Sequence, residues 1–139
     1  MPALTDQQKQ IVQSSFRDVS PKADEIALAF YDRLFTVAPS VRSLFPDDLT
    51  EQRRKLMYTL TLVVANLKNL EEVVPTIEAL GRRHVGYGAE PAHYEVVGGA
   101  LLHALAQGLG PAFTDDVKQA WIAAYGVIQA TMLKAAAAA

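Results

Sequence analysis

The sequence has 139 residues, of which 50% are hydrophobic and 20% are charged, a composition typical of one globular domain. Its formal net charge of −2 gives no bulk attraction to nucleic acid or anionic lipid, and its lack of cysteine excludes disulfides, thiolate metal sites and thiol nucleophiles. No apolar run is long enough to cross a bilayer and no signal-peptide pattern opens the chain, so we expect a soluble, cytoplasmic protein without nucleic-acid or membrane partners.

The first two predicted helices begin at capping signals. Thr5, with Gln8 three positions later, forms a capping-box pattern that predicts a helix ending near Val19. Ser20 followed by Pro21 predicts the N-cap and the first residue of a second helix. The apolar residues of this second helix recur with a period of 3.6 and are Ala27, Phe30, Tyr31, Leu34 and Phe35. One face of the second helix is therefore expected to enter the core.

The middle of the chain is expected to hold one short helix and two longer ones. Prolines bracket a short helical turn over 39–45. A long helix is expected over 49–68, capped by the two aspartates before it. A further helix is expected from Glu71 or Glu72 to Val85, since the proline it contains falls in its first turn and glycines follow its end.

The last two helices are expected over 91–107 and from a cap at Thr114 onward. No stretch alternates with a period of two between hairpin turns, so no strands are expected. We therefore predict an all-α fold of six main helices plus one short helix, forming a single domain over residues 1–134. Residues 135–139 are a low-complexity alanine tail that we expect to be frayed or disordered.

Three polar residues interrupt the apolar faces of these helices, namely Tyr31, Gln52 and His84. Each has an ordinary structural explanation when taken singly. A tyrosine at the edge of a core exposes its hydroxyl, a glutamine one turn into a helix reaches water, and a lone histidine on an apolar face is more often structural than a ligand. His93, in the first turn of a helix, is expected to be solvated, and nothing polar accompanies His103.

The common catalytic motifs are missing from the sequence. It contains no G-x-S-x-G nucleophile motif, no P-loop, and no G-x-G-x-x-G that opens a helix after a strand. His84 and His93 are nine positions apart, so they cannot share one helical face as paired metal-binding histidines do. The carboxylates cluster at expected helix starts, where they act as caps, and a paired-carboxylate hydrolase is not indicated.

Taken together, several segments resemble a bacterial single-domain globin (haemoglobin), of the group related to the haem domain of flavohaemoglobins. The resemblance runs from about Leu4 to Met132. It is carried by AFYDRLFTVAPSVRSLF (29–45), EQRRKLM (51–57), LGRRHVGYG (80–88), HYEVVGGALL (93–102) and AWIAAYGVI (120–128). It implies a globin fold around a haem pocket, with haem b (iron protoporphyrin IX) as the cofactor.

On the proximal side, the resemblance implies that His84 is the iron ligand, with Tyr94 near it and Leu80 beneath the haem. The flavohaemoglobin haem domain has a glutamate late in its last helix that tightens the histidine through the tyrosine, and this chain has no acid there. We therefore expect His84 to orient its second ring nitrogen by a hydrogen bond to a backbone carbonyl of the preceding turn. Arg82 or Arg83 is expected to reach a haem propionate.

On the distal side, the resemblance implies that Tyr31 and Gln52 donate hydrogen bonds to a bound gas. It also implies that Phe45 packs against the porphyrin, that Leu56 lies over the iron, and that Val97 forms part of the pocket wall. Donors of this kind in a dry pocket each strengthen binding by about 1–3 kcal/mol.

The resemblance implies reversible, high-affinity binding of O2, and also of NO and CO, by a metal-binding haem protein. The alternatives are a nitric oxide dioxygenase that depends on a separate flavin reductase, and a gas or redox sensor. A haem-free interaction module would not need Tyr31, Gln52 and His84 together. The sequence ends soon after the last helix, so we expect any reductase to be a separate protein. We also expect the chain to be a monomer or a weak dimer.

Overall fold

Six α-helices make up most of residues 4–137, the part of the chain that the computed structural model describes. They are α1 (Asp6–Val19), α2 (Ala23–Val37), α3 (Thr50–Ala65), α4 (Val74–Gly86), α5 (Pro91–Leu109) and α6 (Asp115–Ala137). Between them lie the short 3-10 helices η1 (Ser20–Lys22), η2 (Pro39–Leu44), η3 (Leu67–Glu72) and η4 (Gly110–Ala112). The described residues contain no strand, and the predicted all-α fold, with η2 as its short helix, is confirmed.

The helix starts at both ends of the chain follow their sequence signals. The Oγ1 atom of Thr5 accepts from the N–H of Gln8 at 3.0 Å, and the Gln8 side chain accepts from the N–H of Thr5 at the same distance, which completes the capping box of α1. At α6, the N–H of Val117 donates to Oγ1 of Thr114 at 3.3 Å. These caps depend on residues within four positions of one another, so the local sequence is sufficient to specify them.

The prediction that Ser20 caps the second helix is wrong. Ser20 has helical dihedral angles, φ −58° and ψ −33°, whereas an N-cap residue needs extended ones. Its hydroxyl instead donates to the carbonyl oxygen of Arg17 at 3.0 Å. The chain runs from α1 straight into η1, with Pro21 at the start of the 3-10 turn, and α2 begins only at Ala23.

The segment between α3 and α4 is less helical than predicted. α3 ends at Ala65 instead of near residue 68, and α4 begins at Val74 instead of at Glu71 or Glu72. The 3-10 helix η3 lies between them and contains a break at Asn69, whose φ of −131° and ψ of 48° are not helical. The helical path between α3 and α4 is therefore interrupted at Asn69.

The alanine tail differs from expectation over the residues that the structure describes. α6 continues through Ala137, and Ala135 is buried. Ala135 follows Met132 by three positions, so both face the same side of the helix, toward α4. The remaining residues of the predicted tail, 138–139, and residues 1–3 of the predicted domain lie outside the described part of the chain.

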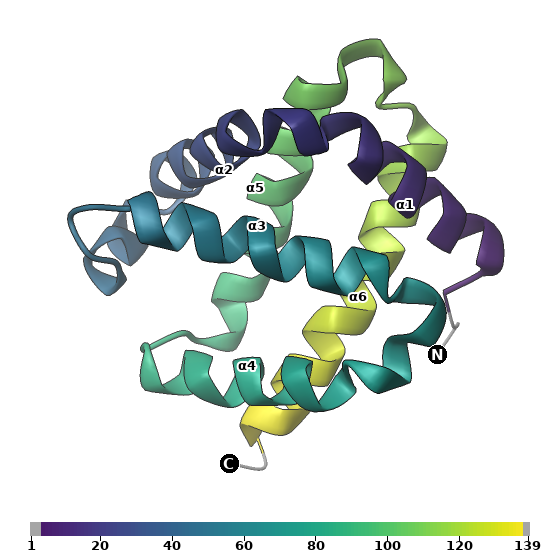
Figure 1. Cartoon of the computed structure of the whole chain (residues 1–139). Coiled ribbons are helices and arrows are strands. Elements are labelled where there is room, and N and C mark those ends of the chain that lie inside the picture. The colour runs from purple at the N-terminus through teal and green to yellow at the C-terminus, as the bar shows by residue number, and fades with distance from the viewer. Residues whose placement is uncertain (1–3, 138–139) are drawn as a thin grey trace.

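The helices pack most extensively between α4 and α6 and between α2 and α5. In Figure 1, α3 lies above α4, and α6 runs from the upper right to the bottom of the molecule, where it meets α4. Gly81 of α4 makes this meeting possible, because a β-carbon there would lie 2.4 Å from the carbonyl oxygen of Met132 in α6. The position of α4 is thus fixed by a backbone-to-backbone approach.

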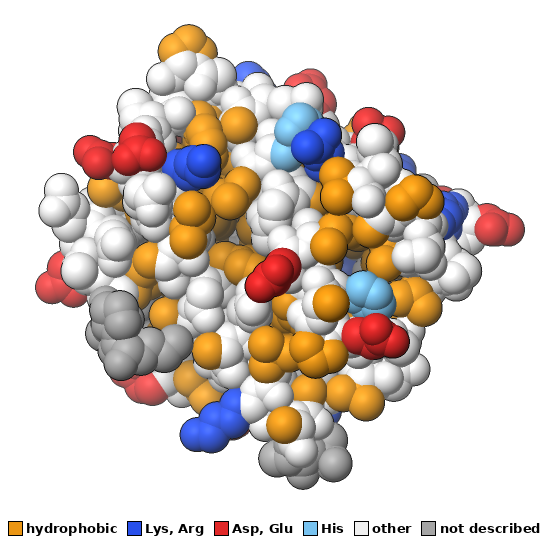
Figure 2. Space-filling view, turned by 180° about the vertical axis from the view of Figure 1, so that it is seen from behind, with side chains coloured by type: hydrophobic (Ala, Val, Ile, Leu, Met, Phe, Trp, Pro, Cys, Tyr) orange, Lys and Arg blue, Asp and Glu red, His pale blue; other side chains and the backbone are white. Residues whose placement is uncertain are grey.

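The molecular surface carries charges of both signs. On the face seen in Figure 2, acidic and basic side chains are scattered singly among hydrophobic ones instead of forming a patch of one sign. Among the described residues, no helix combines the length and hydropathy needed to cross a membrane.

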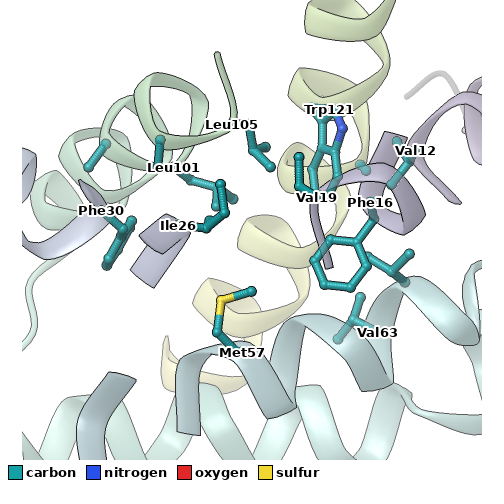
Figure 3. Close-up of a cluster of buried hydrophobic side chains, with 14 of the residues drawn as sticks. Val12, Phe16, Val19, Ile26, Phe30, Met57, Val63, Leu101, Leu105 and Trp121 are labelled. Carbon is teal, nitrogen blue, oxygen red and sulfur yellow. The ribbon is translucent and has the colours of Figure 1, made fainter. Parts of the chain in front are cut away.

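The core beneath α1 is centred on Trp121, which packs against Phe16 with ring centroids 6.1 Å apart. Figure 3 shows Trp121 among side chains from α1, α2, α3 and α5. Its indole N–H donates to Oγ of Ser15 at 2.9 Å, and Ser15 in turn donates to the carbonyl oxygen of Ile11 at 2.8 Å. The buried polar atoms of this cluster are therefore hydrogen-bonded.

Candidate functional site

An apolar cavity of about 180 Å³ lies between the helices. Its walls are drawn from nearly the whole length of the chain, from α1 to α6. Among the lining residues are Val12, Phe30, Leu56, Leu60, Leu80, His84, His93, Tyr94, Val97, Leu101, Trp121, Tyr125 and Met132. Four of the predicted site residues in addition to His84 therefore line it, namely Leu56, Leu80, Tyr94 and Val97. A mainly hydrophobic ligand with a few polar groups suits such a cavity.

His84 lies in the last turn of α4, half-buried in the cavity wall. Its Nδ1 atom lies 2.7 Å from the carbonyl oxygen of Leu80, one turn earlier. A carbonyl only accepts, so Nδ1 carries the proton and Nε2 keeps its lone pair. The expected bond from this histidine to a backbone carbonyl of the preceding turn is confirmed. Burial lowers the pKa of His84 against the opposing effect of the Leu80 bond, and the Arg83 charge lowers it further, so the neutral, metal-binding form is favoured.

A tyrosine pair lies beside His84. The ring centroid of Tyr94 is 6.4 Å from that of His84. The main-chain carbonyl oxygen of Tyr94 accepts from the hydroxyl of Tyr125 at 2.6 Å, which ties α5 to α6. Burial raises the pKa of both tyrosines, so both stay neutral at physiological pH.

The sequence did not single out Tyr125 as a site residue. No neighbouring residue in the sequence signals its place, which depends on packing against Gly98 of α5, where a β-carbon would lie 2.8 Å from the Tyr125 ring. Because Gly98 has no side chain, the Tyr125 ring can lie directly against α5. This packing brings the hydroxyl of Tyr125 to the Tyr94 carbonyl.

The three remaining predicted residues, Tyr31, Gln52 and Phe45, are not among the residues that line the cavity. The structure brings them together beside it. The Tyr31 hydroxyl donates to the main-chain carbonyl oxygen of Gln52 over a long 3.5 Å, and the ring of Tyr31 packs edge-on against Phe45 at 5.7 Å. Phe30, which lines the cavity, packs edge-on against Tyr31 at 4.8 Å and so connects this cluster to the cavity wall.

Tyr31 is buried and stays a neutral hydrogen-bond donor. Burial raises the pKa of its phenol, and the Gln52 side chain and the Arg53 charge oppose this only in part. A neutral phenol beside an apolar cavity is suited to donate a hydrogen bond to a guest that carries partial negative charge.

The other two histidines differ from each other. His93, expected to be solvated, is half-buried and lines the cavity. His103 lies elsewhere on α5, with its Nε2 atom 3.1 Å from the side-chain nitrogen of Gln107. Arg82 and Arg83 are exposed and do not line the cavity.

The donor set fits a haem better than a bare metal ion. No three His, Asp or Glu side chains between residues 4 and 137 form a metal-binding group. Nε2 of His84 offers one nitrogen lone pair from a mainly apolar wall, which instead suits a metal whose other ligands arrive with an apolar macrocycle.

Comparison with known proteins agrees with this arrangement. The profile of the family described as Globin matches residues 28–132. The flavohaemoprotein of Bacillus subtilis (strain 168) is 34% identical over 124 residues, which are 86% of this chain. The chain spans only 31% of that protein's length.

Two solved structures are similar over almost their whole length. A bacterial globin from Campylobacter jejuni is 26% identical with a TM-score of 0.86, covering 96% of this chain and 97% of its own. An engineered carbene transferase, derived from a candidate nitric oxide dioxygenase of Rhodothermus marinus, is 26% identical with a TM-score of 0.89, covering 98% and 95%.

Proposed function

Because the chain belongs to the globin family, we propose that it binds haem b in the cavity and reversibly binds O2, and also NO and CO. The observation that carries this proposal is the 2.7 Å hydrogen bond from Nδ1 of His84 to the Leu80 carbonyl at the wall of an apolar cavity. This bond fixes the ring and leaves Nε2 to bind one iron.

Bound haem supplies an iron with one further coordination position, at which a diatomic gas binds. The protein excludes water from the gas-binding position, because Phe30, Leu56 and Val97 are apolar and line the cavity. Exclusion of water strengthens every hydrogen bond made inside the pocket.

Tyr31 and Gln52 are the proposed hydrogen-bond donors to the bound gas. The hydroxyl of Tyr31 is directed at the Gln52 carbonyl, so it must turn away from that carbonyl to donate to the gas. Its present contact is 3.5 Å, which is long for an O–H···O bond, so little stability is lost when it breaks.

Absorption spectra of the purified protein test the proposal as isolated, after reduction, and with CO. We expect a Soret band in all three states and a shifted band with CO. His84→Ala should abolish or weaken this band, whereas His103→Ala, at the histidine outside the cavity, should leave it unchanged. A wild-type protein that shows no Soret band after reconstitution with haem would contradict the proposal.

A second candidate is nitric oxide dioxygenation, favoured by the similarity to the Rhodothermus marinus protein described above. One NO and one O2 give one nitrate and leave the protein oxidised by one electron, so each turnover needs one electron from a flavin reductase. Catalytic NO consumption with such a reductase supplied would support the enzyme, and a single turnover per protein would support a gas binder.

A further inference from the structure

A second histidine, His93, lines the cavity, and its hydrogen bond favours the tautomer opposite to that of His84. The Nδ1 atom of His93 accepts a hydrogen bond from the main-chain N–H of Glu90 at 3.0 Å. In the neutral ring, an Nδ1 that accepts carries no proton, so the proton is on Nε2. The main chain thus makes His84 a lone-pair donor at Nε2 and makes His93 an N–H donor at Nε2.

We propose that the Nε2–H of His93 binds a propionate carboxylate of the haem, an inference that rests on the proposed haem function. The ring lines the cavity but is only half-buried, so it lies at the edge of the cavity. The charged propionates of a haem whose apolar ring filled the cavity would lie at such an edge. Within residues 4–137 this Nε2 atom has no hydrogen-bond partner. A donor at a partly desolvated site pairs strongly with a carboxylate.

Arg82 and Arg83, one of which is expected from the sequence to reach a propionate, are less well placed than His93. Arg82 and Arg83 are both exposed and neither lines the cavity, whereas His93 does. A half-buried imidazole loses less side-chain freedom on binding a carboxylate than a long, solvated guanidinium does.

The nearest acid does not compete for the same atom of His93. The carboxylate of Glu90 accepts from the main-chain N–H of His93, as part of the reciprocal cap that begins α5. The cap and the proposed contact therefore use different atoms of His93: the main-chain N–H and Nδ1 serve the helix start, and Nε2 serves the haem. His93 is for this reason excluded as a second iron ligand in this tautomer, since its Nε2 offers no lone pair.

Two substitutions of His93 separate its role in the cap of α5 from its proposed contact with the haem propionate. In His93→Asn, the side-chain oxygen takes the place of Nδ1 and keeps the cap, while the donor at Nε2 is lost. In His93→Gln, the amide nitrogen takes the place of Nε2, and its oxygen can reach back to the Glu90 N–H as Gln8 does to Thr5 in α1. The test measures the rate of haem loss from the ferric holoprotein to an excess of a haem-scavenging apoprotein.

We expect His93→Asn to speed haem loss about tenfold and His93→Gln to stay near the wild-type rate. With haem dimethyl ester, which has no carboxylate, all three proteins should lose the group at the same rate. Equal rates of haem loss from the wild type and His93→Asn with ordinary haem would overturn the inference. Faster loss from His93→Asn that persists with the dimethyl ester would also overturn it. Failure of the wild-type chain to take up haem at all would instead overturn the proposed function, and the inference with it.

Discussion

Gly81 and Met132 meet so closely that the main chains of α4 and α6 are in direct contact. A β-carbon on Gly81 would lie 2.4 Å from the Met132 carbonyl oxygen and 2.7 Å from its α-carbon. These are backbone atoms, which cannot rotate out of the way. Because His84 follows Gly81 by one turn of α4, this contact also helps to set the position of His84 in the cavity wall.

The first prediction is that Gly81→Ala destabilises the protein. In an open helix the change from glycine to alanine would stabilise by about 1 kcal/mol, but here the backbone clash outweighs this gain. We expect the free energy of unfolding to fall by about 1–3 kcal/mol in urea titrations, and haem loss to accelerate. Gly86→Ala is the matched control on the same helix, since nothing lies within 4 Å of its added carbon. Equal stability of the two variants would contradict this account of the α4–α6 contact.

The second prediction concerns the distal donor. Tyr31→Phe removes the phenol hydroxyl while keeping the ring, so O2 should dissociate faster by about tenfold for every 1.4 kcal/mol of hydrogen bonding lost. Stopped-flow measurement of O2 release gives the rate. Tyr58→Phe, at a tyrosine that is 71% exposed, should leave the rate unchanged. An O2 release rate in Tyr31→Phe equal to that of the wild type would remove Tyr31 from the proposed mechanism.

The third prediction concerns the buried bond between Trp121 and Ser15. Ser15→Ala leaves the indole N–H buried without its partner, which should lower the free energy of unfolding by about 1–3 kcal/mol. Fluorescence of the chain's single tryptophan can follow the urea transition. Ser14→Ala is the neighbouring control, because its hydroxyl accepts only from the side chain of Gln10 at the surface. We expect that control to change stability by less than about 0.5 kcal/mol.

The fourth prediction is a loss of stability in alkali. Burial, reinforced by the neighbouring Tyr94, raises the pKa of Tyr125 in the folded state above its ordinary value of 10.0. As the pH rises past that value the unfolded chain loses the phenolic proton first, so the free energy of unfolding falls with pH. The decline should be shallower in Tyr125→Phe than in the wild type, as measured by urea unfolding from neutral pH to above pH 10. An identical decline in both proteins would show that Tyr125 does not cause it.

Features that depend on a few neighbouring residues could be predicted from the sequence. The caps at Thr5 and Thr114 are of this kind, as is the bond of His84 to its own preceding turn. The failed cap at Ser20 shows the limit of such signals. A serine before a proline fits an N-cap, yet the chain there stays helical and the hydroxyl turns back to Arg17.

Features that depend on packing between distant segments could not be predicted in this way. Tyr125 reaches the Tyr94 carbonyl only because α6 lies against Gly98 of α5. His93 looked solvated because it lies beside Pro91 in the first turn of a helix, and its place in the cavity follows from how α5 crosses the molecule. The same holds for Tyr31, which is not among the residues that line the cavity but packs against Phe30 in its wall.

The span of the cavity along the chain has a consequence for biosynthesis. Val12 of α1 and Met132 of α6 both line it, so its walls are complete only after α6 has been synthesised. Since chains begin to fold from the N-terminus during translation, the earlier helices must wait with their apolar faces uncovered until α6 emerges from the ribosome. The proposed haem site is therefore complete only once α6 has packed against the earlier helices.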